Sequence, residues 1–467
     1  MYSAFMYNMY RLDRVQTFFM PITLENSRQS LSREMIKRTF LGLTLFCSVI
    51  ASATEMIYAP APLNNPLKGL VPYSSSDAKN RFPHSMEFRY FPMHKIMSGP
   101  DRFDWTIIEE ALTLTQANGC QLIFRVYVEY PGKGLSTPGF LVNEGLKITT
   151  WKADDGISHT PDYTDARLIR AIESCIHALG KKYDGDPRVG FITAGFLGSW
   201  GEWHTYPKDE LWASKDVQSQ ILDAYEKAFK TTPILLRYPA GKDAWDQADN
   251  SKRPFGYHDD SFEWATLHTG IKKDDWFFEA LLRASGTTEK WKQFPIGGEL
   301  RPELWKQSFT IIPHKRSQGF SACVASTHAS WLMDSGLFEQ RYPMSEHRSE
   351  RANLEVRKMG YEYHIATCSR AENVLTLVVE NRGVAPFYYD WPVELALFNQ
   401  GILQASNIVQ PGTKGILPGE PVTWRLQLEP SWTGEFRLRI PNPMPGGKPL
   451  RFANQANVDE WTILGSW

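Results

Sequence analysis

The chain carries almost no net charge. Its 51 Lys and Arg residues are balanced by 52 Asp and Glu residues, which gives a formal net charge of -1 and a pI of about 6.8. A protein that binds nucleic acid or an anionic membrane through its overall field needs an excess of positive charge. We therefore expect no nucleic-acid partner. Local basic pairs such as Lys181-Lys182 fit solvated helix ends better than a binding stripe.

Cysteine is scarce, and no two cysteines are near neighbours in the sequence. The five are Cys47, Cys120, Cys175, Cys323 and Cys368. The absence of any CxxC spacing argues against the common zinc and dithiol redox sites. We expect the last four to be buried free thiols, with a disulfide as the alternative. We expect neither a metal nor another cofactor.

The chain has little continuous hydrophobic sequence. Its main apolar run extends from Thr39 to Ile50, which is shorter than the ~20 residues that a membrane-spanning helix needs. Lys37-Arg38 precede the run and Ala51-Ser52-Ala53 follow it, in the order typical of a secretory signal peptide. We expect residues 1–55 to be an N-terminal extension and signal peptide, with Met35 as the true start. The prediction is a secreted or periplasmic protein without a transmembrane span; an uncleaved anchor is the alternative.

No glycine-rich phosphate loop follows the first expected strand, which argues against a nucleotide-binding fold. Short apolar runs instead alternate with amphipathic stretches of helical period. Eight strands separated by helices predict a (β/α)8 TIM-type barrel over residues 56–360, irregular at its short first and fifth connections. The expected strands are 68–73, 86–91, 121–128, 189–196, 234–238, 255–258, 295–299 and 322–327, and the expected helices include 104–118, 165–183, 214–230, 275–283 and 346–359.

The pattern changes after residue 360. Runs at 374–380, 393–398, 422–428 and 435–440 have strand character, with no helix between them. Pro-Gly pairs punctuate these runs, as at Pro411-Gly412 and Pro418-Gly419. We therefore expect residues 361–467 to form a small Ig-like β-sandwich.

Acidic residues follow two of the expected barrel strands, where the chemistry of such barrels takes place. Glu202 lies in the run Trp200-Gly-Glu-Trp-His204, and Glu299 follows Gly297-Gly298. Flanking indoles can exclude water and raise the pKa of a carboxyl toward the range of a general acid. Structural alternatives are a loop cap or an arginine partner for Glu202, and an ion pair with Arg301 or another arginine for Glu299.

Further candidates stand on or after the same strands. Asp259 and Asp260 are adjacent in a strand, so at most one of them enters the barrel mouth. The arginines could orient carboxylates, bind an acidic sugar or form a buried charge network. The 16 Trp residues include several beside Gly and charged residues, and aromatic faces of this kind stack on sugars as well as in cores. The substrate-binding candidates are Arg89, Arg125, Glu129, Tyr130, Trp200, Trp203, His204, Arg237, His258, Asp259, Asp260, His328 and Trp331.

The pair Glu202 and Glu299 resembles the two acids of retaining glycoside hydrolases with clan A barrels, although that clan has Asn where this chain has Gly201. Asn65-Pro-Leu-Lys-Gly69, Gly201-Glu-Trp203 and Gly297-Gly-Glu299 also resemble a poorly characterised group of secreted bacterial proteins that join such a barrel to a C-terminal β-sandwich. Asn381-Arg-Gly-Val-Ala-Pro-Phe387 fits the same group, and the resemblance covers residues 60 to 465. It implies glycan processing.

The sequence thus leads to a glycoside hydrolase hypothesis. Glu202 would be the acid/base and Glu299 the nucleophile, with Tyr130, Trp200 and Trp203 as platforms for a polysaccharide or oligosaccharide substrate. The alternative is a non-catalytic glycan-binding barrel of the cell envelope. The sugar, the linkage and the oligomeric state stay open.

Overall fold

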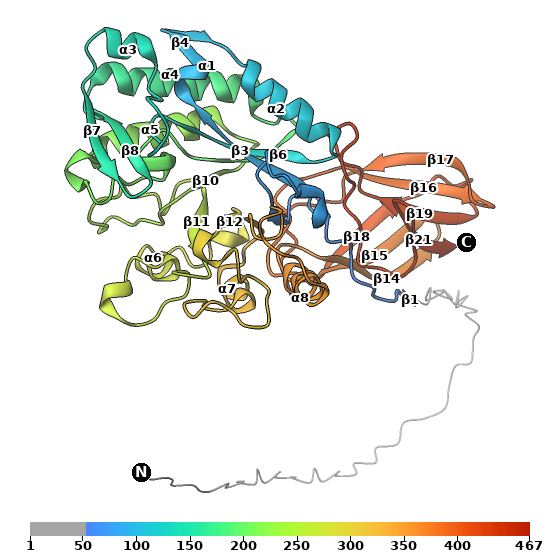
Figure 1. The fold of residues 1–467 in the computed structure, drawn as a ribbon. Coiled ribbons are helices and arrows are strands. Elements are labelled where there is room, and N and C mark those ends of the chain that lie inside the picture. Colours follow the sequence, from blue (N-terminus) through green and yellow to red (C-terminus); the bar gives the residue numbers. More distant parts are fainter. Residues whose placement is uncertain (1–52) are drawn as a thin grey trace, which may run out of the picture. The chain divides into compact units, whose positions relative to one another are not determined.

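The computed structural model describes residues 53–467 (Figure 1). The predicted signal peptide lies outside these residues except for its last few positions. Eight parallel strands form one sheet in the order β2-β13-β12-β11-β10-β9-β6-β3. The sheet closes on itself just beyond β2, where a parallel bridge joins Tyr73 to Phe88. The predicted (β/α)8 barrel is therefore confirmed. Its strands are β2 (Gly69–Val71), β3 (Met86–Pro92), β6 (Gln121–Tyr127), β9 (Val189–Thr193), β10 (Ile234–Leu236), β11 (Gly256–Phe262), β12 (Ile296–Leu300) and β13 (Trp331–Met333).

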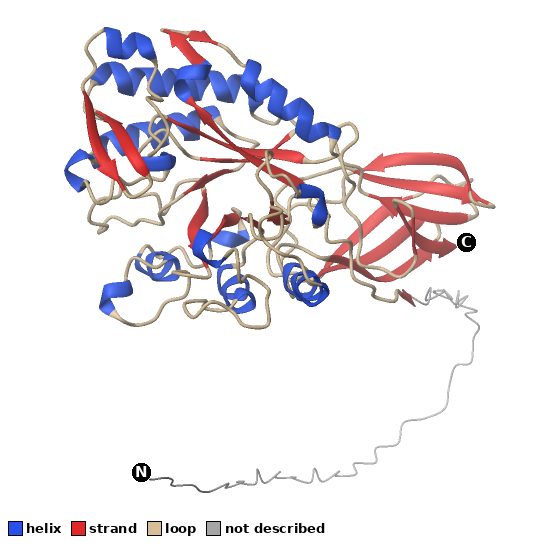
Figure 2. Ribbon diagram, in the orientation of Figure 1, coloured by secondary structure: helices blue, strands red, loops and turns tan. Residues whose placement is uncertain are grey.

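Helices lie between most of the strands (Figure 2). They are α1 (Met93–Ile96), α2 (Thr106–Ala117), α3 (Gly139–Asn143), α4 (Ala166–Tyr183), α5 (Lys215–Ala228), α6 (Phe278–Ala284), α7 (Phe320–Thr327) and α8 (Glu346–Val356). Asp165 and Ser214 cap α4 and α5 through their side chains, as their positions before an amphipathic run predict. The first connection holds only a single 3-10 turn, Lys79–Arg81, and no helix separates β10 from β11. The predicted irregular connections are thus present.

The predicted eighth strand at 322–327 is wrong. These residues form the end of α7, and the eighth strand is β13. The buried residues of α7 are Phe320, Cys323, Val324 and Thr327, which is helical spacing. The predicted helix at 275–283 also begins later than expected, at Phe278.

The C-terminal part is all β, as predicted. One antiparallel sheet has the order β1-β14-β15-β18 and the other β17-β16-β19-β21-β20. Their strands are β1 (Thr54–Glu55), β14 (Tyr363–Ala371), β15 (Val374–Asn381), β16 (Val393–Asn399), β17 (Ile402–Val409), β18 (Val422–Gln427), β19 (Glu435–Arg439), β20 (Asn457–Val458) and β21 (Trp461–Ser466). The sequence missed β14, β17, β20 and β21. It also assigned Thr54 and Glu55 to the leader, whereas they pair with Thr367 and Cys368 of β14.

Two hairpins complete the fold. β4 (Met97–Gly99) pairs with β5 (Arg102–Phe103), and β7 (Ile148–Ala153) pairs with β8 (Gly156–Pro161). The second hairpin lies in the long connection after β6, at 132–163, whose fold the sequence did not reveal. The four cysteines among the described residues are free and buried, as predicted. Within residues 53–467 no helix has the length and apolar character needed to cross a membrane.

Candidate active site

The loop after β9 presents Glu202 at the carboxyl end of the barrel. Its backbone is unusual: Gly198, Trp200, Gly201 and Trp203 all have positive φ, between 56° and 78°. Non-glycine residues avoid this left-handed region, and it is concentrated at functional sites. The loop therefore holds a strained backbone that fixes the direction of the Glu202 side chain.

Gly201 directly precedes Glu202 and has a backbone conformation that favours glycine. Its φ is +69°, and a Cβ added here would lie 3.2 Å from Cδ of Arg125 and 3.2 Å from Cα of Gly195. A side chain at this position would therefore combine backbone strain with a contact against the arginine that binds Glu202.

Glu202 is paired with an arginine in the barrel interior. Its Oε1 accepts a bond from Arg125 Nη1 at 2.9 Å, and its Oε2 lies 3.9 Å from His204 Nε2. Burial acts to raise the pKa of Glu202, but His204 and the charges of Arg125 and Arg237 outweigh burial and lower that pKa to about 2. The expectation that the flanking indoles raise the pKa of Glu202 is therefore wrong. His204 and the buried Arg125 guanidinium contact the carboxylate and stabilise its charged form. An arginine partner for Glu202, which the sequence left open as a structural alternative, is present.

Glu299 is held in the opposite charge state. It is 7% exposed, and its Oε1 accepts a bond from the Tyr73 hydroxyl at 3.1 Å. Burial and the negative charge of Glu202 raise the pKa of Glu299 to about 8, although Arg125 and Tyr73 act to lower it. The surroundings of the two carboxyls thus favour the ionised form of Glu202 and the protonated form of Glu299.

The two adjacent aspartates of β11 point to opposite faces, as predicted. Asp260 pairs with Arg237 Nε on the barrel interior. Asp259 is buried on the other face, where its Oδ2 accepts from Thr266 Oγ1 at 2.7 Å and its Oδ1 from the Ser261 amide at 3.0 Å. Burial raises the pKa of Asp259 to about 7. Only Asp260 belongs to the mouth.

His258 and Trp331 lie deeper in the barrel. Their rings are 5.6 Å apart, and both residues are fully buried. Burial and the charge of Arg125 lower the pKa of His258 well below its usual value. Neither nitrogen of His258 has a hydrogen-bond partner among the described residues. These two residues form the floor beneath the mouth.

Aromatic side chains line one side of the mouth. Tyr130 makes edge contacts with Tyr90 at 5.7 Å and with Trp200 at 6.4 Å between ring centroids. Tyr130 and Trp200 are partly exposed, as a sugar platform requires. Trp203 is different: it is 1% exposed, and its indole N–H donates to the Ala194 carbonyl at 2.9 Å. Trp203 is a core residue, so its predicted platform role is wrong.

Glu129 faces the long connection after β6. Hydroxyl groups of Ser158, Thr160 and Ser199 donate to its Oε1 at 2.6, 2.8 and 3.1 Å. The residue is 1% exposed. It therefore ties the β7–β8 hairpin to the loop that carries Glu202 and has no free surface for a ligand.

Two predicted site residues lie elsewhere. Arg89 is on the outer face of β3, with its guanidinium carbon 5.7 Å from the Phe91 ring centroid. His328 ends α7 and precedes β13, which places it at the amino end of the barrel. Its ring stacks on Trp291 with centroids 3.6 Å apart. The mistaken eighth strand caused the error in placing His328.

The structure adds tyrosines that the sequence reasoning did not select. Tyr73 directly follows β2 and binds Glu299, and Tyr90 of β3 lies 3.4 Å from Arg125 Nη1. Tyr238 follows β10, with its ring centroid 4.0 Å from the Arg237 guanidinium carbon. Each stands at or near a strand end, so the rule that selected the acids would have found them had it been applied to hydroxyl groups.

One set of mouth residues has the composition of a metal site. Ligand atoms of Glu202, His204 and Asp260 all lie within 4.8 Å of one another. Both carboxylates are already neutralised, because Arg125 contacts Glu202 and Arg237 contacts Asp260.

Comparison with known proteins gives architectural neighbours only. No family model matches the chain, and no curated protein matches it. Endo-glycoceramidase II from Rhodococcus sp. is 11% identical over 80% of this chain and 100% of that chain, with a TM-score of 0.40. A family 39 glycoside hydrolase from Bacteroides cellulosilyticus WH2 is 8% identical over 78% of this chain and 81% of that chain, with a TM-score of 0.39.

Proposed function

We propose that this protein is an exported glycoside hydrolase that acts on a polysaccharide or oligosaccharide at the mouth described above. The observation that carries the proposal is the pair of the partly buried Glu202 and the buried Glu299, two carboxyls at one barrel mouth with pKa values of about 2 and about 8. Glycoside hydrolysis uses one carboxylic acid to protonate the leaving oxygen and one carboxylate to attack or to activate water. Partly exposed Tyr130 and Trp200 supply a stacking surface beside the pair.

The charge states favour a particular division of roles. Glu299 carries the proton at neutral pH and is the candidate general acid, whereas Glu202 is ionised and is the candidate nucleophile or base. The resemblance to clan A enzymes implies the reverse assignment. The Arg125 contact supports the ionised state of Glu202, and the Tyr73 hydroxyl orients the Glu299 carboxyl.

The first experiment assays release of reducing ends from a panel of glycans by the wild type, Glu202→Gln and Glu299→Gln. Both variants are expected to lose roughly 10³-fold or more in kcat/KM, since each removes one partner of the two-step chemistry. Glu303→Gln is the matched control, because Glu303 lies on the same rim and is exposed. Equal turnover by all four proteins would contradict the assignment. Glycan binding with no turnover by any of them would favour a non-catalytic binding barrel.

Activated aryl glycosides separate the two roles. Loss of the general acid is tolerated when the leaving group needs no proton, whereas loss of the nucleophile is not. We expect Glu299→Gln to retain cleavage of an aryl glycoside with an acidic phenol, and Glu202→Gln to lose it. The opposite result would restore the roles that the clan A resemblance implies. Proton NMR of the first product anomer then distinguishes retention from inversion.

A further inference from the structure

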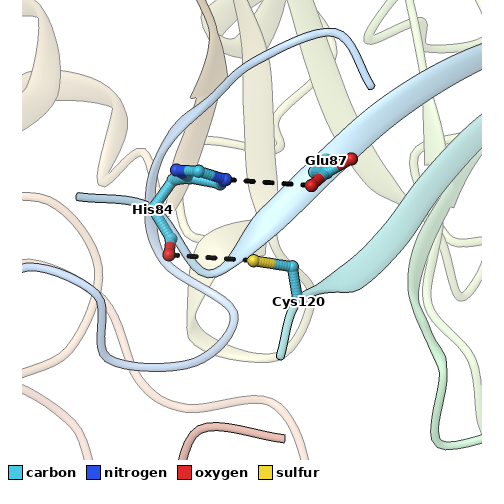
Figure 3. Close-up of side chains that lie close together, drawn as sticks. All are labelled: His84, Glu87 and Cys120. Atoms are coloured by element: carbon cyan, nitrogen blue, oxygen red, sulfur yellow. Dashed lines mark hydrogen bonds and ion pairs between the residues drawn. The ribbon is translucent and has the colours of Figure 1, made fainter. Parts of the chain in front are cut away.

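A second cluster of ligand-type side chains lies at the other end of the barrel, away from the mouth. His84 precedes β3, Glu87 belongs to β3, and Cys120 directly precedes β6 (Figure 3). Their exposed fractions are 6%, 0% and 1%. One ligand atom from each lies within 4.8 Å of those of the other two. An imidazole, a carboxylate and a thiol thus converge in a buried place that the proposed hydrolysis does not use.

The tautomer of His84 is fixed by its neighbour. Nδ1 lies 3.1 Å from the Phe82 carbonyl oxygen, which can only accept, so Nδ1 carries the hydrogen. The other nitrogen, Nε2, is buried and has no hydrogen-bond partner among the described residues. It points at Glu87 Oε1 across 3.9 Å, which is too long for a hydrogen bond. A histidine with its Nδ1–H on a carbonyl and its Nε2 free toward a carboxylate is oriented as a metal ligand is.

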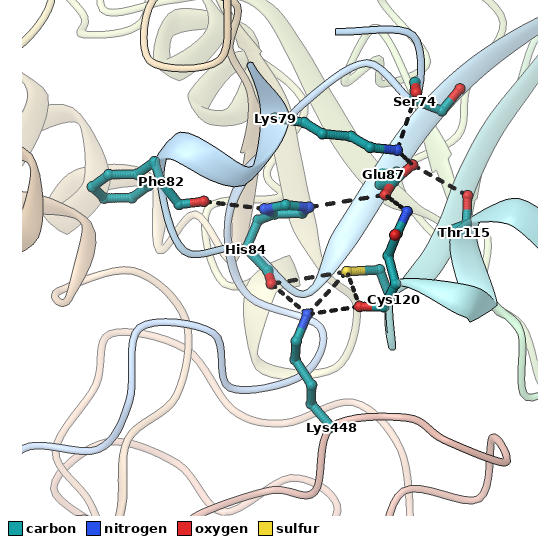
Figure 4. A network of polar contacts seen from close by, with 9 residues as sticks. Ser74, Lys79, Phe82, His84, Glu87, Thr115, Cys120 and Lys448 are labelled. Atoms are coloured by element: carbon teal, nitrogen blue, oxygen red, sulfur yellow. Dashed lines mark hydrogen bonds and ion pairs between the residues drawn. The ribbon is translucent and has the colours of Figure 1, made fainter. Parts of the chain in front are cut away.

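The other two ligands have outer partners that leave room for an ion. Glu87 Oε2 accepts from Lys79 Nζ at 3.0 Å and from Thr115 Oγ1 at 3.4 Å. Among the described residues Oε1 accepts only from Asn118 Nδ2, at 2.8 Å, so Oε1 keeps a lone pair toward His84. Lys448 Nζ lies 3.0 Å from Cys120 Sγ (Figure 4). The same ammonium donates to the carbonyl oxygens of His84 at 2.9 Å and Asn118 at 3.3 Å.

We propose that His84 Nε2, a Glu87 oxygen and Cys120 Sγ form a binding site for a transition-metal cation of the zinc class. Imidazole nitrogen, carboxylate oxygen and thiolate sulfur are the ligands that Zn²⁺ takes, and water completes a four-coordinate set. On binding, the thiol proton passes to solvent and the sulfur–metal bond forms. The ammonium groups of Lys79 and Lys448 oppose the ion, so the affinity is lower than the ligand set alone would give.

The test titrates the full chain with Co²⁺, which reports on its ligands through its electronic spectrum. A thiolate ligand produces a sulfur-to-cobalt charge-transfer band, and Zn²⁺ added afterwards is expected to remove it. The cluster of Glu202, His204 and Asp260 holds no sulfur, so it cannot produce this band. A wild-type protein without the band between pH 6 and 8 would overturn the proposal, and this arm needs no variant to fold. In that case a proton, and not a metal ion, would occupy His84 Nε2.

Variants then locate the site. Cys120→Ser is expected to abolish the band, and His84→Gln to weaken Co²⁺ binding by more than about 100-fold, since even outer partners contribute up to that factor. Cys175→Ser and His364→Gln are the matched controls. Cys175 is a buried free thiol in α4, and His364 has the same Nδ1 contact to a carbonyl, at 2.9 Å from Ala453 O. A band that survives in Cys120→Ser, or that disappears in Cys175→Ser, would contradict the assignment.

A variant of Lys448 provides an independent test of the proposed metal site. Lys448→Met removes one positive charge from beside the sulfur while keeping the length of the side chain. Co²⁺ and Zn²⁺ should then bind at least about 10-fold more tightly. Unchanged affinity in this variant would show that the ion does not lie beside Cys120, which would also overturn the proposal. Far-UV circular dichroism of each variant checks that the fold is retained.

Discussion

The two carboxyl groups at the barrel mouth have environments that move their pKa values apart. Arg125 keeps Glu202 ionised, with a pKa of about 2, whereas burial and the charge of Glu202 raise the pKa of Glu299 to about 8. An acid that must be protonated loses activity as the pH rises through its pKa. We therefore expect kcat/KM to be flat near neutrality and to fall above about pH 8. A pH–rate profile on a soluble substrate measures this limb.

The control for that limb is Tyr73→Phe. The Tyr73 hydroxyl donates to Glu299 and lowers its pKa, so its removal should raise the pKa and move the basic limb to higher pH. The acidic limb of the profile, which reports on Glu202, should stay at the same pH. A basic limb that moves to lower pH, or that persists in Glu299→Gln, would show that another group titrates there.

Arg125, together with His204 and Arg237, favours the ionised state of Glu202. Its Nη1 contacts Glu202 at 2.9 Å, and the guanidinium is buried. Arg125→Met removes an opposite charge that typically lowers a carboxyl pKa by about 1–3 units, so the acidic limb of the profile should rise by that amount. The rate at neutral pH should fall as well. Arg89→Met is the matched control, since Arg89 lies on the outer face of β3 and should leave the profile unchanged.

The sequence indicated which residues lie at the barrel mouth better than it indicated the contacts that those residues make. The alternation of a strand correctly placed only one of Asp259 and Asp260 in the mouth. The direction of the Glu202 pKa was wrong, because the pKa is lowered by the way His204 faces the carboxylate and by Arg125, which is 77 positions away in the sequence. Trp203 was misassigned for a similar reason, since its indole N–H bonds to the Ala194 carbonyl and the ring lies in the core. Such contacts exist only once the strands are assembled.

Element prediction failed at the eighth strand for a recognisable reason. A short apolar run such as Phe320–Thr327 cannot be distinguished from a buried strand by its composition. Its spacing was informative, because Phe320, Cys323, Val324 and Thr327 are buried at helical intervals. The real strand, Trp331–Met333, has three residues and offers too little sequence to show any period. β14 and β17 were missed because tyrosine, histidine and polar residues interrupt their apolar pattern.

The hairpin of β7 and β8 depends on one buried carboxyl. Glu129 accepts hydroxyl bonds from Ser158 and Thr160 of the hairpin and from Ser199 of the loop that carries Glu202. Glu129→Ala leaves these hydroxyls without a partner and should destabilise the protein by about 1–3 kcal/mol. Hydrogen exchange is expected to increase in residues 148–161 and in the loop at 198–204. Mass spectrometry of exchanged peptides measures both regions.

The matched control for Glu129 is Thr150→Ala. Thr150 makes an exposed bond to His159 within the same hairpin, at 3.1 Å, so its loss should change stability by less than about 0.5 kcal/mol. Exchange that increases only in the hairpin of Glu129→Ala, and not near Glu202, would show that Ser199 is held by other contacts.

Across the whole molecule, one hydrophobic cluster spans both kinds of architecture. Barrel residues such as Phe191 and Trp331 belong to the same buried cluster as Tyr361, Leu395 and Phe436 of the C-terminal part. Polar contacts reinforce the junction: Lys68 Nζ donates to the Tyr361 carbonyl at 2.6 Å, and Tyr388 Oη donates to the Trp291 carbonyl at 2.6 Å. The domain division at residue 360 predicted from the sequence stays a prediction, since the cluster crosses it.

A shared core should make unfolding cooperative. Two domains with separate cores unfold in two transitions, whereas parts that bury the same apolar surface unfold together. We expect a single calorimetric transition for the full chain, and Tyr388→Phe should lower the stability of that whole transition by about 1 kcal/mol because it removes the bond to Trp291. Tyr206→Phe is the control, since Tyr206 is 71% exposed on a mouth loop. Two resolved transitions, with only one of them moved by Tyr388→Phe, would show instead that the barrel and the sandwich fold independently.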